Sequence, residues 1–146
     1  MKRTVAALLA GAVVLALGVL AGQVGLLRFP SPGLPDIVPL VKESNLIGRV
    51  SVSRNIYPDV DCELDTGCSR RHARLTTDGM RWWIEDLESA NGTFVGSSAG
   101  PLPAMPIPRG RTELAADTRV YVGAWTRIVI RRATVDEQAA FAGVPV

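Results

Sequence analysis

The sequence is poor in the features that mark enzymes and nucleic-acid-binding proteins. It has one histidine, a net charge of only +2 and no long run of like charge, which argues against a nucleic-acid partner. No Ser-His-Asp order, paired-carboxylate signature or glycine-rich phosphate loop stands in a convincing context. We therefore expect a protein that is not an enzyme and that has no cofactor, no metal and no small-molecule substrate.

Charge is also missing from residues 4–27, an apolar stretch of about two dozen residues. A helix of that length crosses the hydrocarbon core of a bilayer, which is about 30 Å thick. The sequence predicts an uncleaved transmembrane helix over residues 4–27, flanked by Lys2, Arg3 and Arg28. A signal peptide cleaved after Ala21 is the alternative, but the apolar run continues beyond that point and is longer than usual for such a peptide.

The chain after this stretch lacks a helical pattern. Residues 28–45 form a proline-rich linker, because proline cannot continue a helix. Short alternating segments broken by Gly, Pro and Asp follow, which is typical of an antiparallel β-sandwich. The predicted strands are 47–53, 72–77, 81–87, 119–122 and 126–131. We place the sandwich domain at residues 46–132. For the C-terminal tail, residues 133–146, the sequence predicts neither a structure nor a function.

Three short motifs occur in order within the predicted sandwich. They are Ile47-Gly-Arg49, then Cys68-Ser-Arg-Arg-His-Ala-Arg74, then Ala90-Asn-Gly92. Together they resemble the forkhead-associated (FHA) domain, and the resemblance spans Leu46 to Arg132. It implies an FHA-like, all-β antiparallel sandwich that binds phosphothreonine on partner proteins. Three ordered matches are far more specific than any single one.

The resemblance also implies roles for individual residues. Arg49 supplies a fixed cation, Ser69 donates its hydroxyl, and Arg70 matches a position that is often basic and touches phosphate. Asn91 matches the residue that binds the backbone of the peptide. A phosphothreonine carries about −1.5 to −2 charge and three acceptor oxygens, so its reader needs such clustered donors.

Other matching residues have structural roles by resemblance. His72, the only histidine, braces the binding loop by hydrogen bonding, and Gly48 and Gly92 belong to the same bracing.

Two departures from the family pattern favour a second interpretation. Ala90 stands where the family usually has Thr, Ser or another polar residue that reaches the phosphate. The stretch between Arg28 and Gly48 is short and broken by prolines, although the family places two strands there, so an edge strand is expected to be missing. The alternative is a degenerate FHA-like domain that acts as a phosphate-independent structural or assembly module.

The two cysteines, Cys62 and Cys68, lie on the segment that leads into Ser69. A disulfide between them would stiffen this loop in an exported domain, whereas both would be reduced in a cytosolic one. Their spacing with His72 is a poor match to a zinc site.

The leading interpretation is a single-pass, membrane-tethered module that recruits threonine-phosphorylated proteins. The flanking charges weakly favour an external domain. Protein kinases use cytosolic ATP, however, and on that ground we favour the cytoplasmic side.

Overall fold

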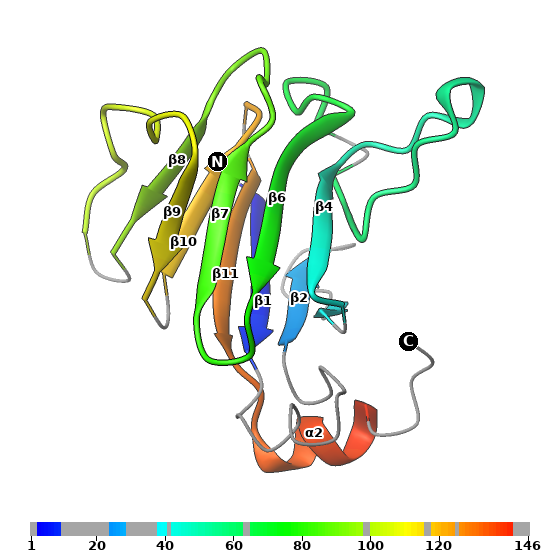
Figure 1. The fold of residues 1–146 in the computed structure, drawn as a ribbon, viewed down its shortest axis with the longest axis vertical. Helices are drawn as coiled ribbons and strands as arrows, with labels where there is room; N and C mark the ends of the chain where they lie inside the picture. Colours follow the sequence, from blue (N-terminus) through cyan, green and yellow to red (C-terminus); the bar gives the residue numbers. More distant parts are fainter. Residues whose placement is uncertain are drawn as a thin grey trace.

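Two β-sheets face each other and enclose the core (Figure 1). The computed structural model describes residues 3–9, 24–28, 38–40, 42–62, 65–97, 100–115, 118–124 and 126–141. Almost all neighbouring strands are antiparallel; β1 with β11 and β4 with β5 are the parallel pairs among the described strands. The predicted all-β sandwich is therefore confirmed.

The chain passes from one sheet to the other more than once. In spatial order, the six-stranded sheet contains β3 (Val38–Leu40), β2 (Val24–Arg28), β1 (Arg3–Leu9), β11 (Thr126–Arg132), β10 (Thr118–Val122) and β8 (Thr93–Gly96). The five-stranded sheet contains β5 (Val60–Asp61), β4 (Ser44–Gly48), β6 (Arg71–Thr77), β7 (Trp82–Asp86) and β9 (Arg111–Leu114).

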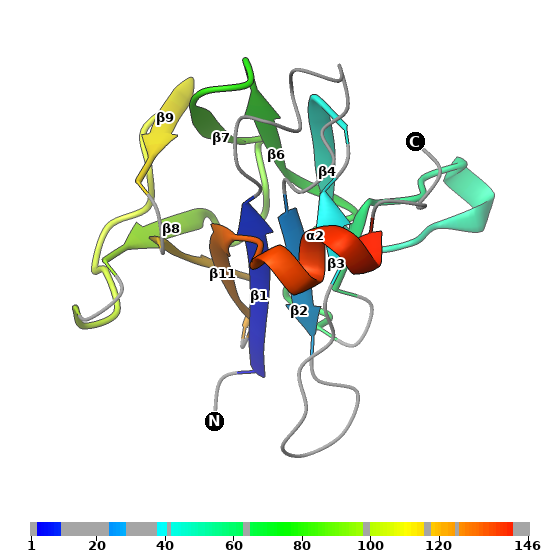
Figure 2. The same ribbon diagram turned by 90° about the horizontal axis from the view of Figure 1, so that it is seen from below.

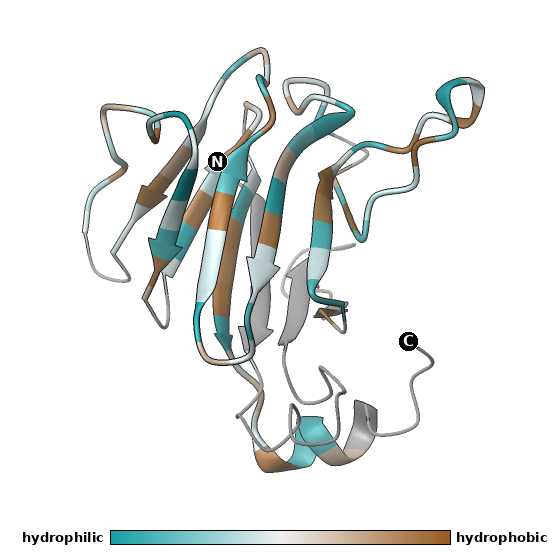
Figure 3. Ribbon diagram, in the orientation of Figure 1, coloured by the Kyte–Doolittle hydropathy of each residue, from teal (hydrophilic) through white to brown (hydrophobic). Residues whose placement is uncertain are grey.

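Hydrophobic and hydrophilic residues alternate along several strands (Figure 3), and the buried hydrophobic residues form the core between the sheets. Trp82 and Ile84 of β7 are buried, as their spacing predicts, while Trp83 faces outward between the guanidinium groups of Arg81 and Arg111, at 5.1 and 4.8 Å from its ring centre. Burying one large apolar side chain contributes about 1.5–3 kcal/mol. The largest fully buried aliphatic side chains of this core are Leu40, Ile47, Leu75, Ile84, Ile128 and Ile130.

Strand β4 is shorter than the predicted strand over 47–53. It ends at Gly48, and a 3-10 helix, η1 (Val52–Arg54), follows. The backbones of Ser51 and Ile56 exchange two hydrogen bonds of 2.9 Å. They close a tight turn that leaves the sheet and projects from the sandwich (Figure 1).

A short helix that the sequence interpretation missed, α2 (Val135–Phe141), lies at the end of the sandwich where β11 ends (Figure 2). Its start is a capping box. The Glu137 N–H donates to Thr134 Oγ1 at 3.1 Å, and the Thr134 N–H donates to Glu137 Oε1 at 2.8 Å. The Thr134-x-x-Glu137 pattern is the sequence signal that could have revealed it.

The N-terminal stretch differs from the predicted transmembrane helix over residues 4–27. Its ends form strands β1 and β2, and β1 pairs in parallel with β11 from Arg3↔Thr126 to Leu9↔Arg132. Those strand pairs use backbone groups that a helix would bond within itself. Residues 10–23 lie outside the described residues, and no described helix has the length and apolarity to cross a bilayer.

Strands β2 and β3 occupy the edge where an edge strand was expected to be missing.

Candidate functional site

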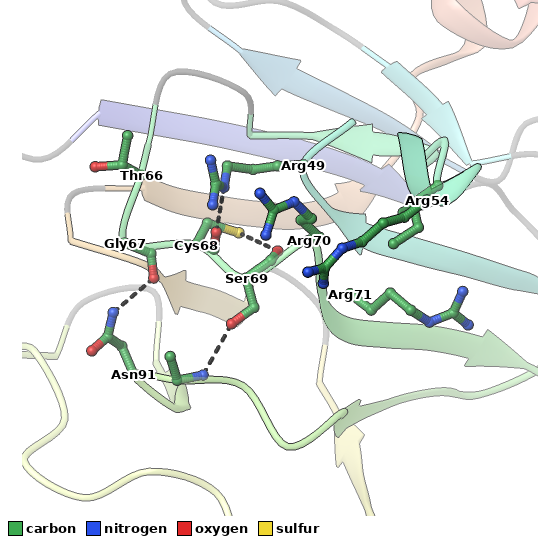
Figure 4. A pocket seen from close by; sticks show the side chains of 11 residues that line it. Arg49, Arg54, Thr66, Gly67, Cys68, Ser69, Arg70, Arg71 and Asn91 are labelled. Carbon is green, nitrogen blue, oxygen red and sulfur yellow. Dashed lines mark hydrogen bonds between the residues drawn. The ribbon is translucent and has the colours of Figure 1, made fainter. Parts of the chain in front are cut away.

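A pocket of about 400 Å³ opens at one end of the sandwich (Figure 4). It lies where the loops β4–β5, β5–β6 and β7–β8 meet. The four residues predicted to bind the phosphopeptide, Arg49, Ser69, Arg70 and Asn91, all line it. The other lining residues are Arg54, Ile56, Thr66, Gly67, Cys68, Arg71 and Ala90. Of these, Arg54, Ile56, Thr66, Gly67 and Arg71 were not identified as site residues from the sequence.

Arg49 is positioned by the close contact of β4 with the start of β6. A Cβ atom on Gly48 would lie 1.8 Å from the carbonyl oxygen of Arg70, so only glycine fits there. The Arg49 N–H donates to the same oxygen at 3.1 Å. Its side-chain Nε donates to the carbonyl of Cys68 at 2.5 Å. The guanidinium is thereby anchored through one nitrogen, and its two terminal nitrogens remain to contact a ligand.

Ser69 and Asn91 connect two loops and keep hydrogen-bonding capacity toward the pocket. Ser69 Oγ accepts a hydrogen bond from the Ala90 N–H at 3.0 Å, so its own hydroxyl proton is available to a ligand. Asn91 Nδ2 donates to the carbonyl of Gly67 at 2.8 Å, which leaves the side-chain oxygen as an acceptor. A hydroxyl and an amide have enough hydrogen-bonding groups for both roles.

His72 lies fully buried beneath these loops. Its Nδ1 accepts a hydrogen bond from the Ser69 N–H at 3.0 Å, so the ring proton is on Nε2, which donates to the carbonyl of Gly92 at 2.9 Å. Gly92 has φ +80°, a conformation that favours glycine. Both ring nitrogens form hydrogen bonds with backbone groups, so His72 braces the loops. It could act as a metal ligand only if one of these hydrogen bonds were broken.

Asp86, the last residue of β7, fixes the conformation of the β7–β8 loop. Its carboxylate accepts hydrogen bonds from the hydroxyls of Ser89 and Thr93, both at 2.6 Å, and from the Ser89 N–H at 3.0 Å. The Ser89 hydroxyl in turn accepts from the Gly92 N–H at 2.9 Å. Partial burial raises the pKa of Asp86, but the hydrogen bonds from Ser89 and Thr93 outweigh it and hold this pKa below its usual value.

Another carboxylate, that of Asp65, secures the β5–β6 loop. It is fully buried and accepts hydrogen bonds from the N–H groups of Gly67 and Ala124, each at 3.0 Å, and from Thr126 Oγ1 at 2.6 Å. A Cβ on Gly123 would come within 2.5 Å of this carboxylate. The Asp-x-Gly turn was the local signal for the role of Asp65, whereas its partners on the distant β10–β11 connection had none.

Cys62 and Cys68 are buried and free, so the disulfide considered from the sequence is not formed in this structure. The Cys62 thiol shares a hydrogen bond with the Cys68 sulfur, and this bond raises the pKa of Cys62 and lowers the pKa of Cys68. The Cys62 N–H also donates to the carbonyl of Gly48 at 2.8 Å. The two residues thus pack beneath the pocket and hold Gly48 and Arg49 in place.

Comparison with known proteins places this geometry in a family. The FHA domain model matches residues 45–123. The FHA domain-containing protein FhaB of Mycobacterium tuberculosis and its counterpart in Mycolicibacterium smegmatis are each 36% identical over 73 residues, which is 50% of this chain. The match covers 43% of the length of these curated relatives. A solved structure from work on phosphothreonine-dependent FHA domain interactions matches with a TM-score of 0.51 and 28% identity, and covers 72% of this chain and 92% of the solved one.

We predict that Asp65→Asn destabilises the domain by about 2–4 kcal/mol, because the new amide group faces N–H donors and leaves buried groups unpaired. The measurement is urea denaturation followed by tryptophan fluorescence. Asp136→Asn, at an exposed aspartate of α2, is the matched control and is expected to change the free energy of unfolding by less than about 0.5 kcal/mol. Equal effects of the two substitutions would contradict the bracing role of Asp65.

Proposed function

Because the chain belongs to the FHA domain family, we propose that its pocket binds phosphothreonine-containing segments of partner proteins. In this role the protein recruits phosphorylated partners and does not catalyse a reaction. The observation that carries the proposal is the convergence of Arg49, Ser69 and Arg70 on one pocket, each with donors still available.

The chemistry of the pocket matches a phosphate group. Phosphate offers three acceptor oxygens, and arginine binds them through paired N–H donors. Arg49 presents its terminal nitrogens, Ser69 its hydroxyl proton, and Arg70 an exposed guanidinium. In the part of the chain that the structure describes, neither Arg49 nor Arg70 forms an ion pair with a carboxylate. The pocket therefore has unneutralised positive charge that a phosphate dianion would stabilise.

Asn91 supplies the contact to the peptide itself. Its side-chain oxygen can accept a backbone N–H of a bound segment, while its Nδ2 is held by Gly67. Such a contact does not depend on sequence, so it would orient the segment. The similarity to a solved structure from work on phosphothreonine-dependent FHA domain interactions supports phosphothreonine as the ligand of the pocket.

Membrane tethering is a further part of the proposal and depends on the sequence. Residues 4–27 contain no charge and have the length of a bilayer-spanning helix. This arrangement excludes strands β1 and β2, because one segment cannot lie both in lipid as a helix and in the sheet as strands. With the anchor in the membrane, the domain would lie on the cytoplasmic side, where kinases have access to ATP.

The first prediction of the proposal concerns phosphate dependence. The chain is expected to bind members of a phosphothreonine peptide library with a Kd near the micromolar range, about −8 kcal/mol, and not their unphosphorylated counterparts. Arg49→Ala should weaken binding by about a hundredfold, because a charge-assisted bidentate contact is lost. Fluorescence polarisation measures both.

Arg109→Ala is the control for this titration, because Arg109 is exposed and lines a different pocket. Thermal unfolding checks that both variants fold. Binding that is indifferent to the phosphate, or that survives Arg49→Ala in a folded protein, would contradict the proposal and favour a phosphate-independent assembly module.

The second prediction concerns Ala90, which lines the pocket but offers no side-chain donor. Ala90→Thr adds a hydroxyl and should tighten phosphopeptide binding by about tenfold, the value of one hydrogen bond to a charged group. Ala90→Val has nearly the same shape without the hydroxyl and should not tighten it. If the two variants bind alike, the residue at this position does not reach the phosphate.

The third prediction tests the anchor. The full chain should sediment with membranes and resist extraction by alkaline carbonate. Replacing both Leu15 and Leu17 by Arg should move it to the soluble fraction, because each charge costs about 2.5–3.5 kcal/mol at the centre of a helix in a bilayer. In spheroplasts, protease added from outside should leave a cytoplasmic domain intact. A parent chain found in the soluble fraction would contradict the anchor.

A further inference from the structure

Among the residues that the structure describes, four arginines and no acidic residue line the pocket. They are Arg49, Arg54, Arg70 and Arg71. Arg54, Arg70 and Arg71 are exposed, and Arg49 is half-buried. No ion pair joins any of the four to a carboxylate among the residues that the structure describes. The pocket thus carries about four positive charges, whereas a single phosphothreonine brings about −1.5 to −2.

The proposed function uses only part of this charge. Arg49 and Arg70 are sufficient to offset one phosphate dianion, and they lie next to Ser69. Arg54 and Arg71 then remain without a counter-charge at the rim. Unpaired guanidinium groups in one pocket repel each other, and a second anion bound there would relieve that repulsion.

The loop that presents Arg54 is held in a defined conformation. Arg54 is the last residue of η1, and Asn55 follows in the left-handed conformation with φ 53° and donates its N–H to the carbonyl of Val52 at 3.1 Å. The paired backbones of Ser51 and Ile56 close the turn, and the Ile56 side chain is buried. The backbone that carries Arg54 is therefore fixed before any ligand arrives, which lowers the entropy cost of binding.

The two arginines share one side of the pocket. Figure 4 shows the Arg54 side chain reaching back toward Arg70 and Ser69, and the Arg71 side chain running along β6 away from the pocket centre. Asn91 lies on the opposite side (Figure 4). A segment that places its phosphothreonine at Ser69 and its backbone at Asn91 would extend toward Arg54 and Arg71.

We propose that Arg54 and Arg71 form a second anion-binding subsite, so that the preferred ligand is a phosphothreonine segment with a second anionic group nearby. The second group is a phosphate or a carboxylate, both of which match the paired donors of arginine. This inference rests on the proposed function, because it assumes a phosphothreonine at Ser69. It adds a class of ligand, a doubly anionic segment, and the two residues that select it.

The test measures the Kd of the full chain for a set of alanine-flanked peptides. One peptide carries a single phosphothreonine, and the others add a second phosphothreonine or a glutamate at two, three or four residues on either side. A peptide with two glutamates and no phosphate completes the set. At the favoured position, the second anion should tighten binding by about three- to tenfold, the range for exposed charged contacts.

The variants identify the residues responsible. In the double variant Arg54→Gln, Arg71→Gln, the ratio between the Kd values of the singly and doubly anionic peptides should fall to about one. Arg109→Gln, an exposed arginine outside this pocket, should keep the ratio of the parent. Comparing the phosphate and glutamate peptides shows which anion the subsite prefers.

The outcomes separate this inference from the proposed function. If the single phosphothreonine peptide does not bind, both fail. If it binds but the second anion has no effect at any position, or the double variant keeps the gain, only the subsite is wrong. Equal tightening at every position, or comparable binding of the phosphate-free peptide with two glutamates, would identify a general polyanion surface and would also overturn the subsite.

Discussion

The pocket depends on one buried histidine that joins two loops from different strand connections. His72 accepts the Ser69 N–H and donates to the carbonyl of Gly92, with both ring nitrogens away from solvent. A buried polar group left without a partner costs about 1–3 kcal/mol. Neither loop can therefore move without a penalty at His72. Asp65 and Asp86 act in the same way on either side, by gathering backbone and hydroxyl donors from the β5–β6 and β7–β8 loops.

This bracing determines what the ligand-facing groups can do. Arg49, Ser69 and Asn91 each make one hydrogen bond to the protein and keep further capacity toward the pocket. A side chain fixed in this way loses little conformational freedom when a ligand binds, so more of the contact energy appears as affinity. The sandwich contributes by holding the ends of β4, β6 and β7 at one rim. Functional side chains on loops above a rigid sheet are a common arrangement for binding sites.

The sequence predicted the parts of the site that depend on local pattern. The alternation around Trp82 and the three short motifs were sufficient to place the sandwich and four pocket residues. Asp65 and Arg54 were missed because their roles depend on segments distant in sequence, the β10–β11 connection for Asp65 and the Ser51–Ile56 turn for Arg54. The apolar N-terminal stretch fits a bilayer helix and a buried strand equally well by composition, so hydropathy alone could not decide between them.

Ala90 and the arginines at the rim indicate that this pocket relies less on hydrogen bonds of defined geometry than on attraction between charges. Ala90 offers only its N–H, which is already donated to Ser69, so this residue gives a phosphate no side-chain donor. The opposite side, with Arg54 and Arg71, has cations without carboxylate partners among the described residues. Attraction between charges acts over several ångströms and tolerates variation in ligand position, whereas a hydroxyl contact does not. A pocket built in this way would select ligands by the number of negative charges near the phosphothreonine more than by the exact geometry around the phosphate.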